Sequence, residues 1–167
     1  IVLSNDLKAP AKKFCDKIII SEYDKLKNIE DFIDKVDVVT FEFENIPFKT
    51  LEYISKSKPV FPKPSINQTI QTRFMEKKFI NNIQIKTTNY ALVRNKFDIL
   101  NNEDLLPGLL KTNTLGYDGK GQYNLKNREE VNELDIEFGK EYILEKKVDL
   151  KKEISVVITR FLNNDFI

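Results

Sequence analysis

Glycine and lysine are concentrated in one short segment, Lys111-Thr-Asn-Thr-Leu-Gly-Tyr-Asp-Gly-Lys-Gly-Gln122, which contains three of the chain's five glycines. Glycine permits positive φ and lets backbone N–H groups approach an anion without a Cβ in the way. Lys111 and Lys120 add positive charge where phosphates would lie, and each charge-assisted hydrogen bond contributes about 1.5–3 kcal/mol. The segment is therefore a candidate phosphate-binding loop. A β-hairpin with a glycine-rich turn and no ligand would have the same composition.

The spacing of the glycines separates this loop from two common phosphate-binding motifs. The chain contains no Gly-x-x-x-x-Gly-Lys-Ser/Thr string, so it has no Walker A loop. The spacing also differs from the Gly-x-Gly-x-x-Gly dinucleotide fingerprint, which needs a helix directly after it. Here strand-like residues lie on both sides of the loop, which predicts a strand–loop–strand arrangement.

The first part of the chain alternates apolar runs with amphipathic stretches. Residues 1–3, 18–20 and 38–43 are typical of strands, and apolar residues recur at helical spacing over residues 26–33 and 48–55. Strands that alternate with helices indicate a parallel α/β sheet. Pro47 lies at the expected start of the second helix. Residues 58–64 contain three prolines and predict a stiff, extended connection.

A second unit is expected after Pro64. Ser65 is predicted to cap a helix in which Ile66, Ile70, Phe74 and Ile80 lie near one face. Strands are predicted near residues 90–93, 109–111, 122–125, 142–145 and 154–159, with a helix at 128–134. We therefore expect two units, residues 1–64 and 65–167.

Composition excludes several classes of function. Twenty-seven basic and 26 acidic side chains give a net charge of +1, which provides no electrostatic footprint for nucleic acid. No apolar run approaches the ~20 residues that a membrane span needs. The single cysteine, Cys15, cannot form an internal disulfide, which favours the cytoplasm. The absence of histidine excludes Ser-His and Cys-His catalysis and His-ligated zinc by this chain alone.

The loop residues, together with three further stretches, resemble the ATP-grasp enzymes and, within them, the N5-carboxyaminoimidazole ribonucleotide synthases. The further stretches are Asp37-Val-Val-Thr-Phe-Glu-Phe-Glu-Asn-Ile-Pro47, Arg73 with Glu76-Lys77, and Ile143-Leu-Glu-Lys-Lys-Val148 leading to Glu153-Ile-Ser-Val156. The resemblance covers nearly the whole chain. It implies a partial Rossmann-like (pre-ATP-grasp) parallel sheet in residues 1–64, followed by the linker helix and small α+β lobe of an ATP-grasp fold.

The resemblance also implies how ATP is bound. Lys111 would contact the inner phosphates, and Arg73 would approach the nucleotide from the linker helix. Glu153 would accept hydrogen bonds from the ribose hydroxyls, a role that suits a carboxylate because it only accepts. Its alternative is a surface salt bridge with Lys151 or Lys152. The loop would cover the phosphates with Gly116, Tyr117, Asp118, Gly119, Lys120, Gly121 and Gln122. The hinge, which pairs with the adenine edge through its backbone, would be Glu145, Lys146, Lys147 and Val148.

Contacts to the second substrate follow from the same resemblance. Tyr117 and Asp118 would face aminoimidazole ribonucleotide, with Asp118 accepting from its exocyclic amine. Glu42 and Glu44 alternate along the predicted strand and so share one face at its carboxyl end, where open α/β sheets place ligands. Glu44 and Asn45 are therefore candidate substrate contacts, with strand termination before Pro47 as the equal alternative.

The implied reaction converts ATP, bicarbonate and aminoimidazole ribonucleotide to ADP, phosphate and the N-carboxylated product through carboxyphosphate, with Mg²⁺ neutralising the phosphates. We expect the chain to lack the family's first strand and glycine-rich turn before Ile1, and the second half of the fold after Ile167. Catalytic residues and metal ligands would then lie outside this span. The chain alone would be inactive, and the full-length protein would be a homodimer. Alternatives are formate-dependent glycinamide ribonucleotide transformylase, biotin carboxylase, or a non-catalytic ATP-binding module.

Overall fold

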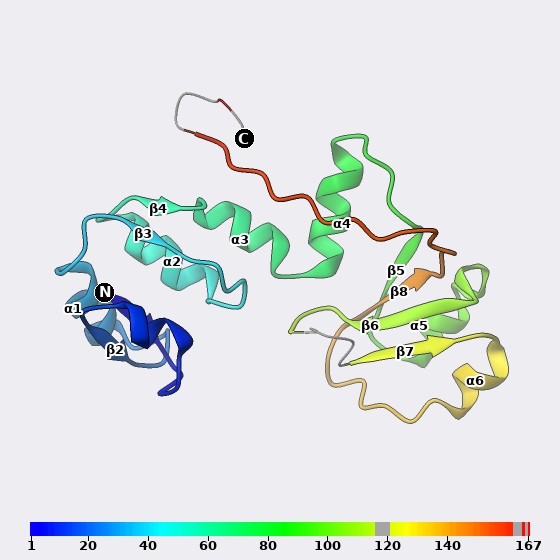
Figure 1. Ribbon diagram of the computed structural model, residues 1–167. Coiled ribbons are helices and arrows are strands. Elements are labelled where there is room, and N and C mark those ends of the chain that lie inside the picture. Colours follow the sequence, from blue (N-terminus) through cyan, green and yellow to red (C-terminus); the bar gives the residue numbers. More distant parts are fainter. Residues whose placement is uncertain (116–120, 162–164, 166) are drawn as a thin grey trace.

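The computed structural model describes residues 1–115, 121–161, 165 and 167. Figure 1 shows two lobes, joined by the helices α3 (Pro64–Ile70) and α4 (Arg73–Asn82). The first lobe contains parallel strand pairs and the second an antiparallel sheet, so the expected α/β class with two kinds of sheet is confirmed. Among the described residues, no helix is long and apolar enough to cross a membrane.

The first lobe contains two separate pairs of parallel strands. β1 (Val2–Ser4) pairs with β2 (Ile18–Ile20), with Leu3 opposite Ile19. β3 (Val39–Thr40) pairs with β4 (Val60–Phe61). A 3₁₀ helix, η1 (Pro10–Phe14), lies between β1 and β2. The strands are parallel as expected, but the structure forms two ladders where one continuous sheet was predicted.

Two short amphipathic helices pack on these strands. α1 (Leu26–Ile33) buries Ile29, Phe32 and Ile33, and α2 (Phe48–Ser55) buries Leu51 and Ile54. They form one core with Val39 and Val60 from the second strand pair. Burial of a side chain of this size contributes roughly 1.5–3 kcal/mol. The helices therefore hold the short strands in place.

The linker is two helices, which corrects the prediction of one helix capped by Ser65. Ser65 lies inside α3, whose N-cap is Lys63. The helical conformation is interrupted at Gln71 and Thr72. Thr72 then caps α4, because its hydroxyl accepts a hydrogen bond from the Met75 N–H. Pro47 likewise is the N-cap of α2 and does not lie within the helix.

The second lobe is a four-stranded antiparallel sheet in the order β5-β8-β6-β7. β5 (Tyr90–Val93), β6 (Gly108–Thr112), β7 (Gln122–Leu125) and β8 (Tyr142–Lys146) match the predicted strands closely. α5 (Lys96–Leu100), the 3₁₀ helix η2 (Glu103–Leu105) and α6 (Arg128–Glu133) complete the lobe. Its core includes Val93, Ile99, Leu110, Val131 and Leu144.

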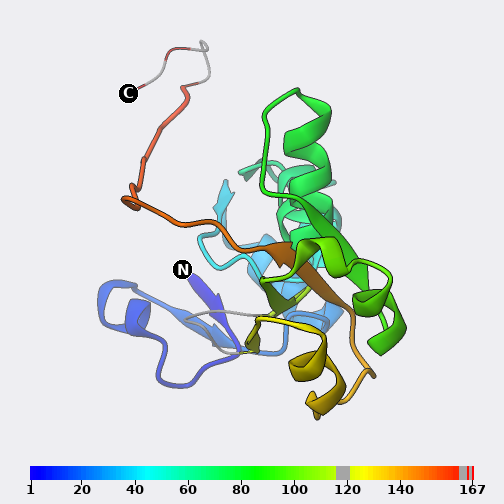
Figure 2. The same ribbon diagram turned by 90° about the vertical axis from the view of Figure 1, so that its right-hand side faces the viewer.

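Two predicted strands are shorter or absent. The strand expected over residues 38–43 ends at Thr40, so Glu42 and Glu44 lie beyond it and their shared strand face is not formed. Residues 154–159 form no strand, because no described strand pairs with them, and Val156 and Val157 are exposed. Figures 1 and 2 show this segment leaving β8 without joining the sheet, and in the view of Figure 1 it passes α4 and continues above α3.

Candidate functional site

The two faces of the second sheet differ: one packs on the core of the lobe, and the other carries charged side chains. Side chains alternate between the faces of a strand, so Leu110 of β6 and Leu144 of β8 point into the core shared with α5 and α6. Their neighbours Lys111 and Glu145 therefore lie on the opposite face. Lys111 and Glu145 thus share one face of the sheet.

A cluster of three charged residues lies on this face, formed by Lys77, Lys111 and Glu145. The Lys111 Nζ donates to Glu145 Oε2 at 2.9 Å, and the Lys77 Nζ lies 3.4 Å from Oε1. The Glu145 side chain is 9% exposed, Lys77 16% and Lys111 22%. The carboxylate is almost buried, and Lys111 keeps the largest solvent-facing surface of the three.

The N-terminus of α4 is attached to the end of β6. The Arg73 N–H donates to the Asn113 carbonyl at 2.9 Å, and the Phe74 N–H donates to Asn113 Oδ1 at 3.0 Å. The Arg73 Nε donates to the Thr112 carbonyl at 3.2 Å. Asn113 is buried and also donates to Glu141 Oε2 at 3.1 Å. Since protein atoms satisfy these first N–H groups, they are not available to an anion.

The strands predicted on either side of the glycine segment are present. β6 and β7 pair antiparallel with Lys111 opposite Gln122, and the Thr112 N–H donates to the Gly121 carbonyl at 3.0 Å. Gly121 has a φ of 69°, a conformation that glycine adopts without strain. The remaining predicted loop residues lie outside the described residues: Gly116, Tyr117, Asp118, Gly119 and Lys120.

The hinge residues 145–148 make more backbone contacts with the protein than the sequence indicated. The Lys146 N–H donates to the Asn89 carbonyl at 2.9 Å, and the Lys146 carbonyl accepts from the Thr88 hydroxyl at 2.7 Å. The Lys147 N–H donates to the Pro107 carbonyl at 2.9 Å. Val148 is exposed, and its N–H has no hydrogen-bond partner within the described part of the chain. Val148 is therefore the predicted hinge residue whose N–H is free for a ligand.

The two candidate substrate contacts line neighbouring hollows. Glu44 and Arg73 line a polar cavity of about 60 Å³, which has room for about two waters and is too small for a nucleotide. Asn45 lines a larger hollow of about 430 Å³ together with Asn5 and Tyr23. This volume is within the range of small-molecule sites. Asn5 directly follows β1, so the hollow lies at the carboxyl end of that strand.

The carboxyl group of Glu76 also lines the smaller cavity and has a perturbed pKa. Burial raises the pKa of Glu76, with Arg73 and Lys77 opposing the shift and the carboxylates of Glu44 and Glu145 adding to it. Three acids and three bases, counting Lys111, thus face one another around α4. The positive charge expected for phosphate binding is largely balanced within the chain.

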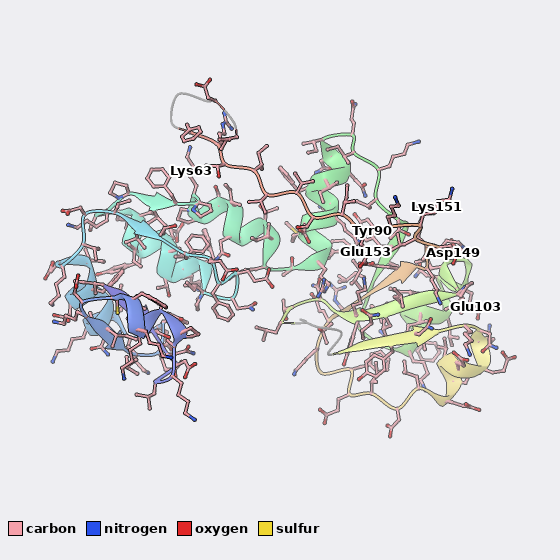
Figure 3. All side chains as sticks on the ribbon, viewed as in Figure 1. Lys63, Tyr90, Glu103, Asp149, Lys151 and Glu153 are labelled. Carbon is pink, nitrogen blue, oxygen red and sulfur yellow. The ribbon has the colours of Figure 1, made fainter. Side chains whose placement is uncertain are left out.

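Glu153 lies on the tail that follows β8 and is exposed. Figure 3 shows Asp149, Lys151 and Glu153 following one another along this segment. Among the described residues, Glu153 forms no ion pair with Lys151 or Lys152. Its role with a ribose stays a prediction.

Sequence reasoning assigned no role to Lys77 or Asn113. Lys77 follows Arg73 by four residues, so the two lie on the same side of one helix, and that spacing could have identified it. Asn113 carried no such signal, because its partners Phe74 and Glu141 are 39 and 28 residues away.

The described residues do not fit a magnesium ion. They contain no group of three potential metal-ligating Asp, Glu, His or Cys side chains. Glu145, the most buried carboxylate of the site, is already paired with two ammonium groups. That the metal ligands lie outside this span stays a prediction.

Comparison with known proteins places this geometry in a family. A ribonucleotide synthetase pre-ATP-grasp domain matches residues 1–71, and an ATP-grasp domain matches residues 78–167. The bifunctional purine synthesis protein purC/E of Dictyostelium discoideum is 36% identical over 86% of this chain and 15% of its own length. The N5-carboxyaminoimidazole ribonucleotide synthase of Brucella melitensis is 32% identical over 96% of this chain and 46% of its own.

A solved structure shares the fold over the whole chain. The ADP complex of purK, an N5-carboxyaminoimidazole ribonucleotide synthetase, superposes with a TM-score of 0.90 at 33% identity and covers 100% of this chain and 45% of that one. The chain thus spans less than half the length of these relatives. It belongs to the ATP-grasp family, and the relatives to which it is similar include N5-carboxyaminoimidazole ribonucleotide synthases.

Proposed function

We propose that this chain provides one side of the nucleotide site of an ATP-dependent carboxylase, which converts 5-aminoimidazole ribonucleotide and bicarbonate to N5-carboxyaminoimidazole ribonucleotide in purine synthesis. The observation that carries the proposal is the Lys111–Glu145 pair, which lies on the non-core face of the sheet between the glycine loop and the hinge. The relative that superposes over the whole chain is an ADP complex, which supports nucleotide binding by this protein.

Different residues contact different parts of ATP. The Lys111 ammonium contacts the inner phosphates, because it is the lysine of the cluster with the most exposed side chain. Arg73 approaches from α4, and residues 116–122 cover the phosphates. The Val148 N–H pairs with the adenine edge, and Glu153 accepts from the ribose hydroxyls. Tyr117 and Asp118 contact the ribonucleotide.

The hollow at the carboxyl end of β1 is the proposed site of the ribonucleotide substrate. Its volume of about 430 Å³ suits a small molecule, and Asn45 and Leu115 both line it. Leu115 directly precedes the glycine loop, so a substrate there would lie beside the predicted phosphate cover. Glu44 and Asn45 are then neighbours of both ligands.

We also propose that the chain divides into two units at residue 64. The full-length protein is proposed to be a homodimer and to be located in the cytoplasm.

Transfer of the terminal phosphoryl group to bicarbonate forms carboxyphosphate and ADP, and attack by the substrate amine then releases phosphate. This chain contributes positioning and charge neutralisation to these steps. Mg²⁺ would be held by residues outside this span.

The test is ADP release by the full-length protein with ATP, Mg²⁺, bicarbonate and 5-aminoimidazole ribonucleotide. We expect turnover that needs both acceptors and falls at least about tenfold in Lys111→Met, which removes a charge-assisted hydrogen bond. Lys126→Met is the matched control, because Lys126 is exposed and, within the described residues, its ammonium pairs with Glu130 alone. The 167-residue chain alone is expected to be inactive. Turnover with glycinamide ribonucleotide and formate, or with biotin, would replace the proposed substrate, and ATP binding without turnover would indicate a non-catalytic module.

A further inference from the structure

Glu145 is shared by two lysines that approach from different elements. Lys111 comes from the neighbouring strand β6 and contacts Oε2, whereas Lys77 comes from α4 and contacts Oε1. Each carboxylate oxygen therefore has its own ammonium partner. A single ammonium group would neutralise the carboxylate, so the second one is in excess.

Lys77 is held in place by contacts that do not involve Lys111. Its Nζ lies 5.8 Å from the centroid of the Tyr90 ring, within the range of a cation–π interaction. Tyr90 is opposite Glu145 in the β5–β8 ladder, and Phe74 packs edge-on against the Tyr90 ring at 5.8 Å. The position of Lys77 beside Glu145 is thus built into the packing of α4 on the sheet.

A phosphate at this face requires Lys111 to turn away from Glu145, at least in part. If Lys111 were the sole cation beside the almost buried Glu145, this movement would be costly, because the carboxylate charge would then be neither hydrated nor paired. Lys77 removes this cost, since it stays within ion-pair distance of the other carboxylate oxygen.

We propose that Lys77 is a positioning residue, a standby counter-ion that takes over Glu145 when Lys111 turns to the phosphates of a bound nucleotide. The inference rests on the proposed function in one respect, that the nucleotide phosphates bind at Lys111. It assigns to Lys77 no contact with the nucleotide. It also assigns to the Glu145 carboxylate a role separate from its backbone in the hinge.

The experiment is titration of the full-length protein with ADP by calorimetry, in a double-mutant cycle. Lys77→Met is expected to weaken ADP binding about tenfold, because Lys111 then stays on Glu145. Lys77→Arg keeps a cation and is expected to bind within about threefold of wild type. In the E145Q background, Lys77→Met is expected to change affinity less than about twofold, since no carboxylate remains to be neutralised. Lys78→Met is the matched control, because Lys78 is the next residue of α4 and is exposed.

The cycle separates this role from a merely structural one. If Lys77 only stabilised the fold, K77M would weaken binding equally with and without the Glu145 charge, and that result would overturn the proposal. Unchanged ADP affinity in K77M would overturn it too while leaving the nucleotide site intact. Failure of the wild-type protein to bind ADP would instead remove the proposed function, and this inference with it. If K77M does not fold, the comparison of K77R with wild type and of E145Q with E145Q/K77M carries the test.

Discussion

The Nε of Arg73 donates to the backbone carbonyl of Thr112 at 3.2 Å, which joins the first residue of α4 to the last residue of β6. Thr112 begins the hairpin that leads to the glycine loop, and its N–H is bonded to Gly121 on the returning side. The linker helix and the two ends of the loop therefore share one anchor. The arginine predicted to approach a nucleotide thus also fixes the base of the loop.

Asn113→Ala is expected to lower the free energy of unfolding by about 2 kcal/mol. The change removes the acceptor for the Phe74 N–H and a donor to the Glu141 carboxylate, and it leaves a partly buried N–H unpaired. Urea denaturation of the full-length protein measures the effect. Asn124→Ala is the control, because Asn124 is exposed on β7 and should stay within about 0.5 kcal/mol of wild type. An equally small effect for Asn113→Ala would show that α4 is held by other contacts.

Glu76→Gln is expected to stabilise the protein at neutral pH and to have no such benefit in acid. Burial raises the pKa of Glu76 in the folded state above its unfolded value of ~4.3. The folded state thus binds more protons between these two values, so the Glu76 contribution becomes unfavourable as pH rises through that window. Below the unfolded pKa both states are protonated and the cost disappears.

Urea denaturation at a series of pH values from 4 to 8 measures the Glu76 effect as the difference between variant and wild type. Glu52→Gln on α2 is the control, since it makes the same chemical change at an exposed position. A Glu76→Gln difference that is destabilising at pH 7 would mean that attraction from Arg73 and Lys77 outweighs burial.

The parts of the fold that sequence could predict are those whose signal is local. Residues 48–55 and 90–93 were placed correctly, because apolar periodicity alone distinguishes a helix from a strand there. The break at Thr72 was missed, since the apolar spacing continues across it and only the capping hydroxyl marks it. Residues 154–159 have strand composition, yet a strand also needs a partner, and composition carries no information about partners.

The candidate site shows the same division between local and distant information. Lys111 was identified from its place beside the glycine segment, whereas its pairing with Glu145 joins residues 34 positions apart. Which backbone groups of the hinge are free also depends on distant partners, such as Asn89 and Pro107. Sequence therefore indicated the types of residue present, and only the fold shows which of them neutralise one another.

Val148→Pro is expected to weaken binding of ADP about tenfold and to leave binding of inorganic tripolyphosphate unchanged. Proline removes the N–H that has no partner among residues 1–115 and 121–161 and that we propose pairs with the adenine edge. Calorimetric titration of the full-length protein with each ligand gives the comparison. Leu150→Pro is the control, because Leu150 is 65% exposed on the same segment. Equal losses for both ligands would indicate a disturbed fold, and no loss for ADP would remove Val148 from the adenine site.

Gly108→Ala is expected to destabilise the protein by about 1–3 kcal/mol, the usual cost of overpacking a tight site. A Cβ at Gly108 would lie 2.8 Å from the Leu105 carbonyl oxygen and 3.1 Å from that of Glu145. Both contacts are with backbone, which cannot turn aside as a side-chain end can. Since Gly108 lies opposite Lys146 in the ladder, the strain falls directly on the hinge.

Gly139→Ala is the matched control for Gly108→Ala, because a Cβ at Gly139 would meet no atom within 4 Å. It should leave the free energy of unfolding unchanged or raise it slightly, since alanine restricts the unfolded chain. Thermal and urea denaturation distinguish the two variants, and ADP titration adds a second readout. Displacement of the hinge by Gly108→Ala should weaken ADP binding even at temperatures where the variant is fully folded. A folded Gly108→Ala protein with wild-type affinity would show that the end of β6 can shift without moving residues 145–148.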